Sequence, residues 1–280
     1  MSPRFVAALV ALVTVLADGP PAQGDGRAPP RPLVLFLHGY GGSPRLLDDG
    51  LDVTALAARH HLIPLLPAGR LDRAGQRFWR AGPSCCDFFG ADAAGVDDRA
   101  RLLALSRDTQ RRRGADPQRL YVIGHSNGGH LAYRLACAPD SGLAAIVSLA
   151  GADFGDTPCA SSTRLSVLQV QSAHDPIVPY QPACVTRPGR PRPLCYPGAE
   201  TSTRRWALRL GCAPQRVAER ALRMAGGLSV QREHYAACPP GLEVALWTVH
   251  GGGHTTDTFA PLMDTIVAWL IAHPRPRAIR

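Results

Sequence analysis

Short apolar runs alternate along this chain with longer segments in which apolar and polar residues mix. Continuous apolar runs are typical of strands that are buried on both faces, whereas longer mixed segments favour helices. We expect strands at residues 33–37, 62–66, 120–123, 143–149, 167–171 and 243–249. We expect helices at residues 53–60, 97–113, 129–136, 200–210 and 259–272. Strands that alternate with helices predict an α/β fold, with a mostly parallel sheet and helices on both of its faces.

The N-terminus has the composition of an export signal. A short basic start precedes an apolar run at residues 5–17, which contains no cysteine and is too short to span a bilayer comfortably. We therefore predict a signal peptide at 1–17, with an uncleaved membrane anchor as the alternative, and export from the cytoplasm. The Gly- and Pro-rich residues 18–32 are expected to form a disordered leader. Residues 33–273 then form a single domain, followed by a basic tail at 274–280.

Charge adds little to this interpretation. The chain has 280 residues, is 45% hydrophobic and carries a net charge of +9, with arginine at all 31 basic positions. The basic residues at 111–113 and at Arg187, Arg190 and Arg192 have no aromatic side chains between them. Nucleic-acid surfaces commonly combine basic and aromatic side chains. We therefore expect a solvated basic face and no nucleic-acid partner.

The cysteine content fits an exported protein. The chain has an even number of cysteines, eight, which suggests disulfides. Because no C-x-x-C motif is present, a zinc ribbon is not indicated. Eight cysteines allow 105 pairings, so each pairing is a hypothesis. We expect Cys184 to pair with Cys195 around a Pro- and Arg-rich loop that resembles a lid, at residues 181–200. We expect Cys212, after a helix, to pair with Cys238, which ends a possible strand.

Four cysteines remain, and two of them are neighbours. Cys85 and Cys86 are adjacent in the chain. We expect them to bond to different partners, which are most simply Cys137 and Cys159.

The sequence Gly124-His125-Ser126-Asn127-Gly128 carries the clearest chemical signal. It matches the G-x-S-x-G nucleophile elbow, in which a sharp turn between a strand and a helix exposes a serine hydroxyl. An expected strand precedes it and an expected helix follows. The glycines allow neighbouring backbone to approach the strained turn. The sequence therefore predicts that Ser126 is a nucleophile rather than an ordinary helix N-cap.

A serine nucleophile needs a base and an acid that orients the base. Asp175 follows the expected strand at 167–171, and His254 follows the one at 243–249. The order Ser126, Asp175, His254 is the order found in α/β-hydrolases. Both residues lie beyond the carboxyl ends of strands, where the ligands of open α/β sheets bind. We expect them to complete a catalytic triad.

Other residues remain as alternatives. Asp153 and Asp257 are substitutes for the acid, and His250 is a substitute for the base. His125, His130 and His174 are expected to serve in local packing or capping.

Attack on an ester carbonyl also requires two donors for the oxyanion. In this kind of site they are backbone N–H groups of the residue after the serine and of a loop after an early strand. Here these are Asn127 and Tyr40. Gly39, Gly41 and Gly42 would let the Tyr40 amide turn inward, although a simple glycine turn is the alternative.

Taken together, these residues resemble the secreted esterase family that contains polyhydroxybutyrate depolymerases, mycobacterial lipoprotein-type relatives and feruloyl esterases. The similarity runs from about residue 32 to residue 272. Its markers are Leu37–Ser43, Trp79, Cys85 with Cys86, Val96–Asp98, Gly124–Gly129, Asp175–Tyr180, Trp206, Gly211 with Cys212, and Gly251–Thr255. The resemblance implies an α/β-hydrolase catalytic domain with the triad named above, and with no metal and no organic cofactor.

Three departures from the family pattern bear on the substrate. Thr256-Asp257 stands where Trp-Pro is common, Gln171–His174 stands where the loop before the acid usually begins His-Gly, and the insertion between Cys184 and Cys195 is unusual. We expect a secreted or periplasmic serine carboxylic-ester hydrolase acting on soluble feruloyl, acetyl-sugar or hydroxybutyrate oligomer esters. A serine peptidase and a non-catalytic binding protein on the same scaffold are the alternatives.

Overall fold

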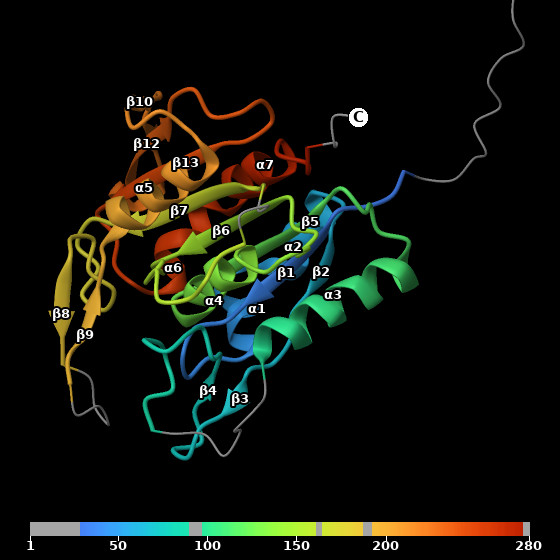
Figure 1. The fold of residues 1–280 in the computed structure, drawn as a ribbon, viewed down its shortest axis with the longest axis horizontal. Helices are drawn as coiled ribbons and strands as arrows, with labels where there is room; N and C mark the ends of the chain where they lie inside the picture. Colours follow the sequence, from blue (N-terminus) through green and yellow to red (C-terminus); the bar gives the residue numbers. More distant parts are fainter. Residues whose placement is uncertain (1–28, 90–96, 161–163, 187–191, 277–280) are drawn as a thin grey trace, which may run out of the picture.

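A twisted central sheet runs through the molecule (Figure 1). The computed structural model describes residues 29–89, 97–160, 164–186 and 192–276. Within these residues the sheet has nine strands in the order β10-β12-β13-β7-β6-β5-β1-β2, with β11 paired to β12. Its strands are β1 (Leu33–Leu37), β2 (Ile63–Leu65), β5 (Leu120–His125), β6 (Ala145–Leu149), β7 (Ser166–Ser172), β10 (Arg216–Ala218), β11 (Leu222–Arg223), β12 (Ser229–Tyr235) and β13 (Val244–His250).

Most neighbouring strands of the sheet are parallel. The pairs β2–β1, β1–β5, β5–β6, β6–β7 and β7–β13 are all parallel, so their carboxyl ends meet at one edge. Strand β12 is antiparallel to β13, and β10 and β11 are antiparallel to β12. The predicted α/β class with a mostly parallel sheet is therefore confirmed. The antiparallel edge was not predicted, because β12 reads Ser-Val-Gln-Arg-Glu-His-Tyr and lacks a continuous apolar run.

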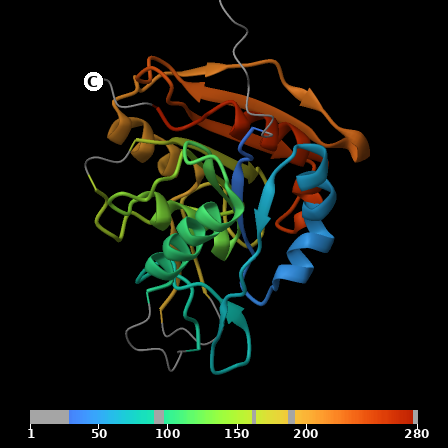
Figure 2. The ribbon, with the colours of Figure 1, turned by 90° about the vertical axis from the view of Figure 1, so that its right-hand side faces the viewer.

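Helices cover both faces of the sheet (Figures 1 and 2). One face carries α3 (Asp98–Arg113), α4 (Asn127–Ala136) and α5 (Ala199–Leu210). The other carries α1 (Pro44–Leu51), α2 (Val53–Arg59), α6 (Thr256–Phe259) and α7 (Met263–Ile271). Short 3₁₀ helices form at η1 (Ala225–Gly227) and η2 (Ala260–Leu262).

Alternate side chains of one strand enter two different cores. Leu33, Leu35 and Leu37 of β1 pack with the helices on the α3 side, whereas Val34 and Phe36 pack with those on the α1 side. Successive side chains of a strand point to opposite faces. Burial on both faces therefore requires the continuous apolar run from which this strand was predicted.

Some predicted elements differ in detail. The helix expected at 259–272 is divided into α6, η2 and α7, and Pro261 lies in the first turn of η2. Proline lacks the N–H that a continuous helix needs in its interior. The unpredicted helix α1 starts after Ser43, whose hydroxyl accepts a hydrogen bond of 3.1 Å from the N–H of Leu46.

Two small hairpins project from the carboxyl edge of the sheet (Figure 1). One pairs β3 (Arg70–Leu71) with β4 (Arg77–Phe78). The other pairs β8 (Ala183–Val185) with β9 (Leu194–Tyr196), inside the segment expected to be a loop. Leu194 and Tyr196 pack there with Ala152 and Val178, so the hairpin is anchored to the body of the protein.

Two of the expected disulfides form, and the expectation for the other four cysteines is wrong. Cys184 bonds to Cys195 across the β8–β9 hairpin, and Cys212 bonds to Cys238.

Cys85 bonds to its neighbour Cys86, and Cys137 bonds to Cys159 with their Cα atoms 4.2 Å apart. The backbone brings Cys159 beside the end of α4, because the N–H of Ala160 donates to the carbonyl of Cys137. This contact gives Cys137 a partner other than Cys85 or Cys86. The prediction assumed instead that adjacent cysteines must find separate partners.

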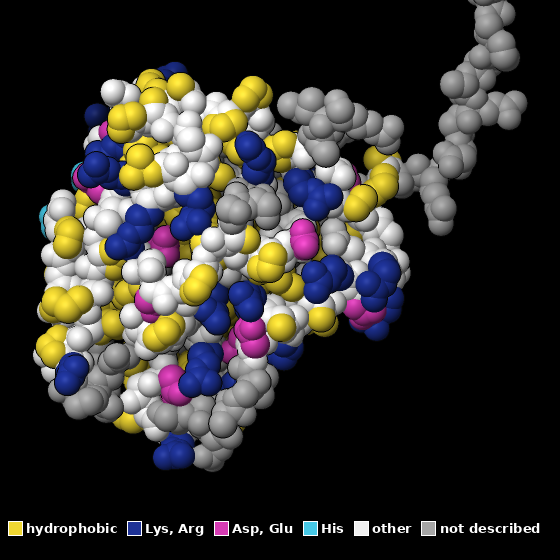
Figure 3. All heavy atoms as spheres, viewed as in Figure 1, with side chains coloured by type: hydrophobic (Ala, Val, Ile, Leu, Met, Phe, Trp, Pro, Cys, Tyr) yellow, Lys and Arg dark blue, Asp and Glu magenta, His cyan; other side chains and the backbone are white. Residues whose placement is uncertain are grey.

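The terminal segments lie mostly outside the described residues. This applies to the predicted signal peptide, to the leader up to residue 28 and to the tail from residue 277. Among the described helices, none is long and apolar enough to cross a membrane. Arginine side chains are spread over the face in Figure 3 among acidic and uncharged ones. The basic run at 111–113 includes Arg111, which lies 3.3 Å from Asp108.

Candidate active site

Ser126 occupies the turn between β5 and α4. It adopts φ 54° and ψ −117°, a conformation that residues with a side chain rarely take up. A hydrogen bond of 2.8 Å from its N–H to the carbonyl of Leu149 ties the turn to β6. Strain of this kind persists only where the surroundings enforce it, and it is concentrated at functional sites. The turn has the geometry of a nucleophile elbow.

The two glycines of the elbow are required by close backbone approach. A Cβ atom at Gly124 would overlap the carbonyl of Gly128, and one at Gly128 would overlap the carbonyl of Leu37. Any larger residue would push α4 away from β5 and β1. The spacing of the motif is therefore a packing requirement of the turn.

An imidazole connects Ser126 to a buried carboxylate. His254 Nε2 lies 2.9 Å from Ser126 Oγ, and its Nδ1 lies 2.8 Å from Asp175 Oδ2. An ionised carboxylate only accepts hydrogen bonds, so Nδ1 carries the proton and Nε2 is left to accept from the serine hydroxyl. This tautomer is the one in which a histidine can take a proton from serine.

Asp175 is surrounded by donors. Its Oδ1 accepts from the N–H groups of Ile177 (2.8 Å) and Val178 (2.9 Å). Its Oδ2 accepts from Gln171 Nε2 (3.0 Å) and from His254. Because its side chain is fully buried, these four bonds replace the water that an ionised carboxylate needs.

The loop that carries His254 is held at three points. The Ser172 hydroxyl donates to the carbonyl of Gly252, and the N–H of Gly253 donates to Thr258 Oγ1 at 2.9 Å. His125 Nε2 donates to the carbonyl of His254 itself at 2.7 Å. Burial first, and then the nearby His254, lower the pKa of His125 to about 4. His125 is therefore a neutral donor at physiological pH.

Backbone amides beside Ser126 are available for an oxyanion. Asn127 is the first residue of α4, and the first N–H groups of a helix have no partner within the helix. Gly39 lies against Ser126, since a Cβ added to Gly39 would be 3.2 Å from that of Ser126. The next residue, Tyr40, donates no backbone hydrogen bond from its N–H within the described residues. Both predicted donors therefore lie on segments that border the serine.

Trp79 joins the two segments that carry these amides. Its indole N–H donates to the carbonyl of His38 at 2.8 Å. Its backbone N–H and carbonyl form two bonds, of 2.7 and 2.8 Å, with the side-chain amide of Asn127. One buried residue thus fixes the Tyr40 loop relative to the start of α4. In the sequence, only the family resemblance draws attention to Trp79.

The structure places the alternative residues elsewhere. Asp153 is held by Arg205 and Ser202 near α5, and Asp257 is exposed and accepts from Thr255. His250 is exposed at the end of β13, and His174 is exposed beside Asp175. His254, rather than His250, contacts both Ser126 and Asp175.

Sequence reasoning missed several supporting residues, of which Gln171 and Ser172 contact the loops of this site directly. A signal was present, because Gln169 and Gln171 are polar residues inside a strand that is buried throughout. Buried polar side chains need partners, so their presence in an apolar run points to a network.

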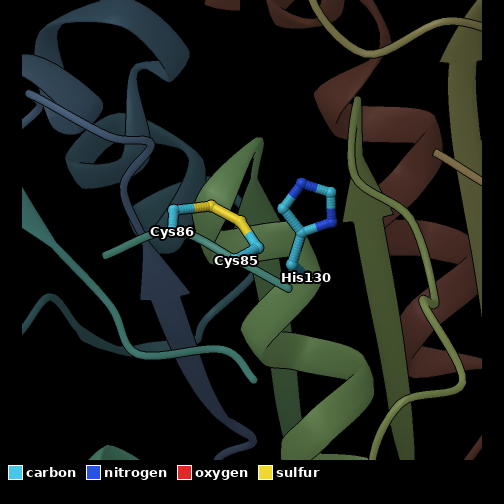
Figure 4. A group of neighbouring side chains, drawn as sticks. All are labelled: Cys85, Cys86 and His130. Atoms are coloured by element: carbon cyan, nitrogen blue, oxygen red, sulfur yellow. A yellow bond between two sulfur atoms is a disulfide. The ribbon is translucent and has the colours of Figure 1, made fainter. Parts of the chain in front are cut away.

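Cys85, Cys86 and His130 lie close together (Figure 4). Their candidate ligand atoms are all within 4.8 Å of one another. The two sulfur atoms are bonded to each other, however, and thiolates are what bind metals. Asn127 Nδ2 is 3.9 Å from Cys85 Sγ, so the disulfide packs against the residue after Ser126. This group is a structural support of the site in its oxidised form.

A strand-turn-helix elbow at the carboxyl edge of a parallel sheet defines an α/β-hydrolase. Solved structures agree on the fold. An acetyl xylan esterase from Aspergillus awamori has a TM-score of 0.60 at 14% identity, covering 89% of this chain and 91% of its own. Esterase PE8 has a TM-score of 0.50 at 17% identity, covering 87% of this chain and 93% of its own.

Sequence comparisons identify the family. The model of the family described as Esterase PHB depolymerase matches residues 20–199, and the chain belongs to this family of esterases. A protein named esterase NocK from Nocardia uniformis subsp. tsuyamanensis is 33% identical over 260 residues, which are 85% of this chain and 68% of that protein. Feruloyl esterase B from Piromyces equi is 25% identical over 235 residues, covering 82% of this chain but only 40% of that protein.

Proposed function

We propose that the protein is a serine carboxylic-ester hydrolase that works through an acyl-enzyme. Ser126 Oγ attacks the acyl carbon while His254 Nε2 takes its proton. The protonated imidazole then gives this proton to the leaving alcohol. Water, activated by the same imidazole, releases the acid and restores Ser126. Asp175 keeps the imidazole in the productive tautomer and stabilises its charged form.

The N–H groups of Asn127 and Tyr40 are proposed to hold the oxyanion of each tetrahedral intermediate. Donors of this kind each lower the barrier by about 3–4 kcal/mol. The observation that carries the proposal is the unbroken contact from Ser126 through His254 to Asp175 beside the strained elbow.

We propose soluble esters as substrates, namely feruloyl, acetyl-sugar or hydroxybutyrate oligomer esters. Family membership supports the ester, and the names of the related proteins span feruloyl and acetyl groups. The ring centroids of Tyr40 and Phe88 lie 4.9 Å apart, and we propose that this apolar surface beside the oxyanion loop contacts the acyl group. A panel of the three ester types, compared by kcat/KM, identifies the preferred acyl group.

Replacing the nucleophile tests the mechanism. Ser126→Ala is expected to abolish hydrolysis of p-nitrophenyl acetate and labelling by a fluorophosphonate, while the melting temperature stays near that of the wild type. Ser106→Ala is the control, because Ser106 is a buried serine on α3 that takes no part in the proposed mechanism. Retention of both activities in Ser126→Ala contradicts the mechanism. Faster cleavage of an amide than of the matched ester would instead identify a peptidase.

We also propose a secreted or periplasmic location. All cysteines of the chain are in disulfides, which persist in oxidising compartments. Mass spectrometry of the protein from the producing cells tests this location, with a mature N-terminus near residue 18 as the expected result.

A further inference from the structure

We propose that Gln171 is a positioning residue for the catalytic acid, at the end of a buried hydrogen-bond chain that runs from Tyr133 through Gln169 to Asp175. The inference rests on the proposed function, in which Asp175 orients His254. It assigns a role to two glutamines that no catalytic step uses.

The hydrogen-bond chain from Tyr133 to Asp175 is continuous, and its bonds have ordinary lengths. Tyr133 Oη lies 2.8 Å from Gln169 Oε1, and Gln169 Nε2 lies 2.9 Å from Gln171 Oε1. Gln171 Nε2 then lies 3.0 Å from Asp175 Oδ2, the oxygen that also meets His254. This hydrogen-bond chain links α4 and β7 to the loop that carries Asp175.

The carboxylate dictates the direction of every bond in the chain. Asp175 and the carbonyl of Val178, which lies 2.8 Å from Gln171 Nε2, can only accept. The NH₂ group of Gln171 must face them, which turns its oxygen toward Gln169. Gln169 then donates to Gln171 and to the carbonyl of Gly151 at 3.0 Å.

The hydrogen-bond chain begins at the Tyr133 hydroxyl, a donor that stays protonated. The remaining oxygen of Gln169 must accept, and the Tyr133 hydroxyl supplies the hydrogen. Burial raises the pKa of Tyr133 well above its ordinary value, so the phenol stays protonated. Each donor in the chain therefore points toward Asp175, with no alternative arrangement of the amides.

Gln171 fixes the plane of the carboxylate. Its two N–H groups bind Asp175 and the carbonyl of Val178, while the N–H of Val178 binds the other oxygen of Asp175. Both carboxylate oxygens of Asp175 are thus bound by groups that are themselves connected, Gln171 and the Val178 backbone. Rotation of this group would misalign the imidazole, and displacements of about 1 Å in an active site can cost about a hundredfold in rate.

The test compares two glutamines on the same strand. Gln169 and Gln171 are 0% and 1% exposed, so Gln→Met at either position removes a buried amide at nearly constant volume. Gln171→Met is expected to lower kcat for p-nitrophenyl acetate about ten- to a hundredfold with KM unchanged. Gln169→Met is expected to lower kcat less, because Gln171 still reaches Asp175.

Two further readouts separate positioning from packing. The His254 proton shared with Asp175 is expected to give a far-downfield ¹H resonance, and this resonance is expected to shift in Gln171→Met. In an Asp175→Asn background, Gln171→Met is expected to cause no further fall in kcat, because the carboxylate that Gln171 orients is already absent. Gln171→Asn is the alternative variant if Gln171→Met does not fold, because its shorter amide is withdrawn from Asp175.

Equal falls in kcat for the Gln169 and Gln171 variants, an unchanged downfield resonance, or an undiminished effect in the Asp175→Asn background would overturn the proposal. A failure of the serine mechanism is recognised separately, because Ser126→Ala would then keep its activity. The downfield resonance reports on the His254–Asp175 pair whatever the reaction is.

Discussion

The hydroxyl of Ser172 donates a hydrogen bond of 2.6 Å to the carbonyl of Gly252. Ser172 ends β7, three residues before Asp175, and Gly252 precedes His254 by two residues. This bond therefore joins the loop of the proposed acid to the loop of the proposed base. Ser172 belongs to the segment Gln171–His174, which stands where the loop of the related esterases usually begins with His-Gly.

Removing this bond is expected to loosen the base loop. Ser172→Ala leaves the carbonyl of Gly252 without this donor, which should lower kcat about threefold to tenfold and the unfolding free energy by about 1–3 kcal/mol. Steady-state kinetics and urea unfolding measure the two effects. Ser106→Ala is the control, because the Ser106 hydroxyl is buried and has no partner within the described residues. Equal effects of the two substitutions would contradict the role of the bond.

The identity of the acid is tested by exchanging carboxylate for amide. Asp175→Asn keeps the shape of the side chain but favours the wrong imidazole tautomer, which should lower kcat about a thousand- to ten-thousandfold. Asp257→Asn changes an exposed residue that contacts Thr255, and its kcat should stay within about twofold of the wild type. If Asp257→Asn caused the larger loss, the assignment of Asp175 would be wrong.

Trp79 is expected to align the two proposed oxyanion donors. Trp79→Phe removes the indole donor to the carbonyl of His38 and should lower kcat about tenfold, with little change in KM. Trp247→Phe is the matched control, since this buried indole N–H has no partner within the described part of the chain. It is expected to change stability but not kcat. The same loss of kcat in both variants would contradict a specific role for Trp79.

His125 should make the free energy of unfolding depend on pH. Its pKa of about 4 in the folded protein lies below its ordinary value of 6.5, chiefly because of burial. Acid therefore favours the unfolded chain, and the contribution of a neutral His125 is complete above about pH 6.5 and lost as the pH falls toward 4. A shift of this size corresponds to about 3 kcal/mol, and the partial exposure of His125 makes the real loss smaller.

Urea unfolding of the wild type and of His125→Gln at pH 7, 5 and 4 measures this contribution. Glutamine keeps an N–H donor for the carbonyl of His254 but does not titrate in this range. The difference in unfolding free energy between the two proteins should change in favour of the variant as the pH falls. A constant difference across the three pH values would show that His125 is not the titrating group.

Local patterns were sufficient to predict much of the fold, and they also indicated the three residues of the proposed triad. The apolar runs of β1, β5, β6, β7 and β13 predicted their strands because strands buried on both faces are mostly apolar, with few polar positions such as Gln169 and Gln171 of β7. Ser126, Asp175 and His254 each follow such a strand. The carboxyl ends of parallel strands meet at one edge, so the strand order along the chain already predicted that these residues would converge.

The cysteines and strand β12 show what local patterns do not predict. The bond between Cys137 and Cys159 joins the end of α4 to a separate segment, and Cys85 and Cys86 bond to each other. Strand β12 has no apolar run, because its pairing comes from backbone bonds to β13 and its polar side chains are compatible with a sheet edge.

The sequence alone thus determined the fold class, the elbow and the order of the three proposed catalytic residues, since each depends on neighbouring residues or on strand order. Only the tertiary structure decided which side chains hold these residues in place. Gln171, Ser172 and Trp79 act through hydrogen bonds to partners on other loops and strands. Such bonds require donor and acceptor atoms on packed elements to be placed to within a few tenths of an ångström, and no residue spacing along the chain encodes that placement.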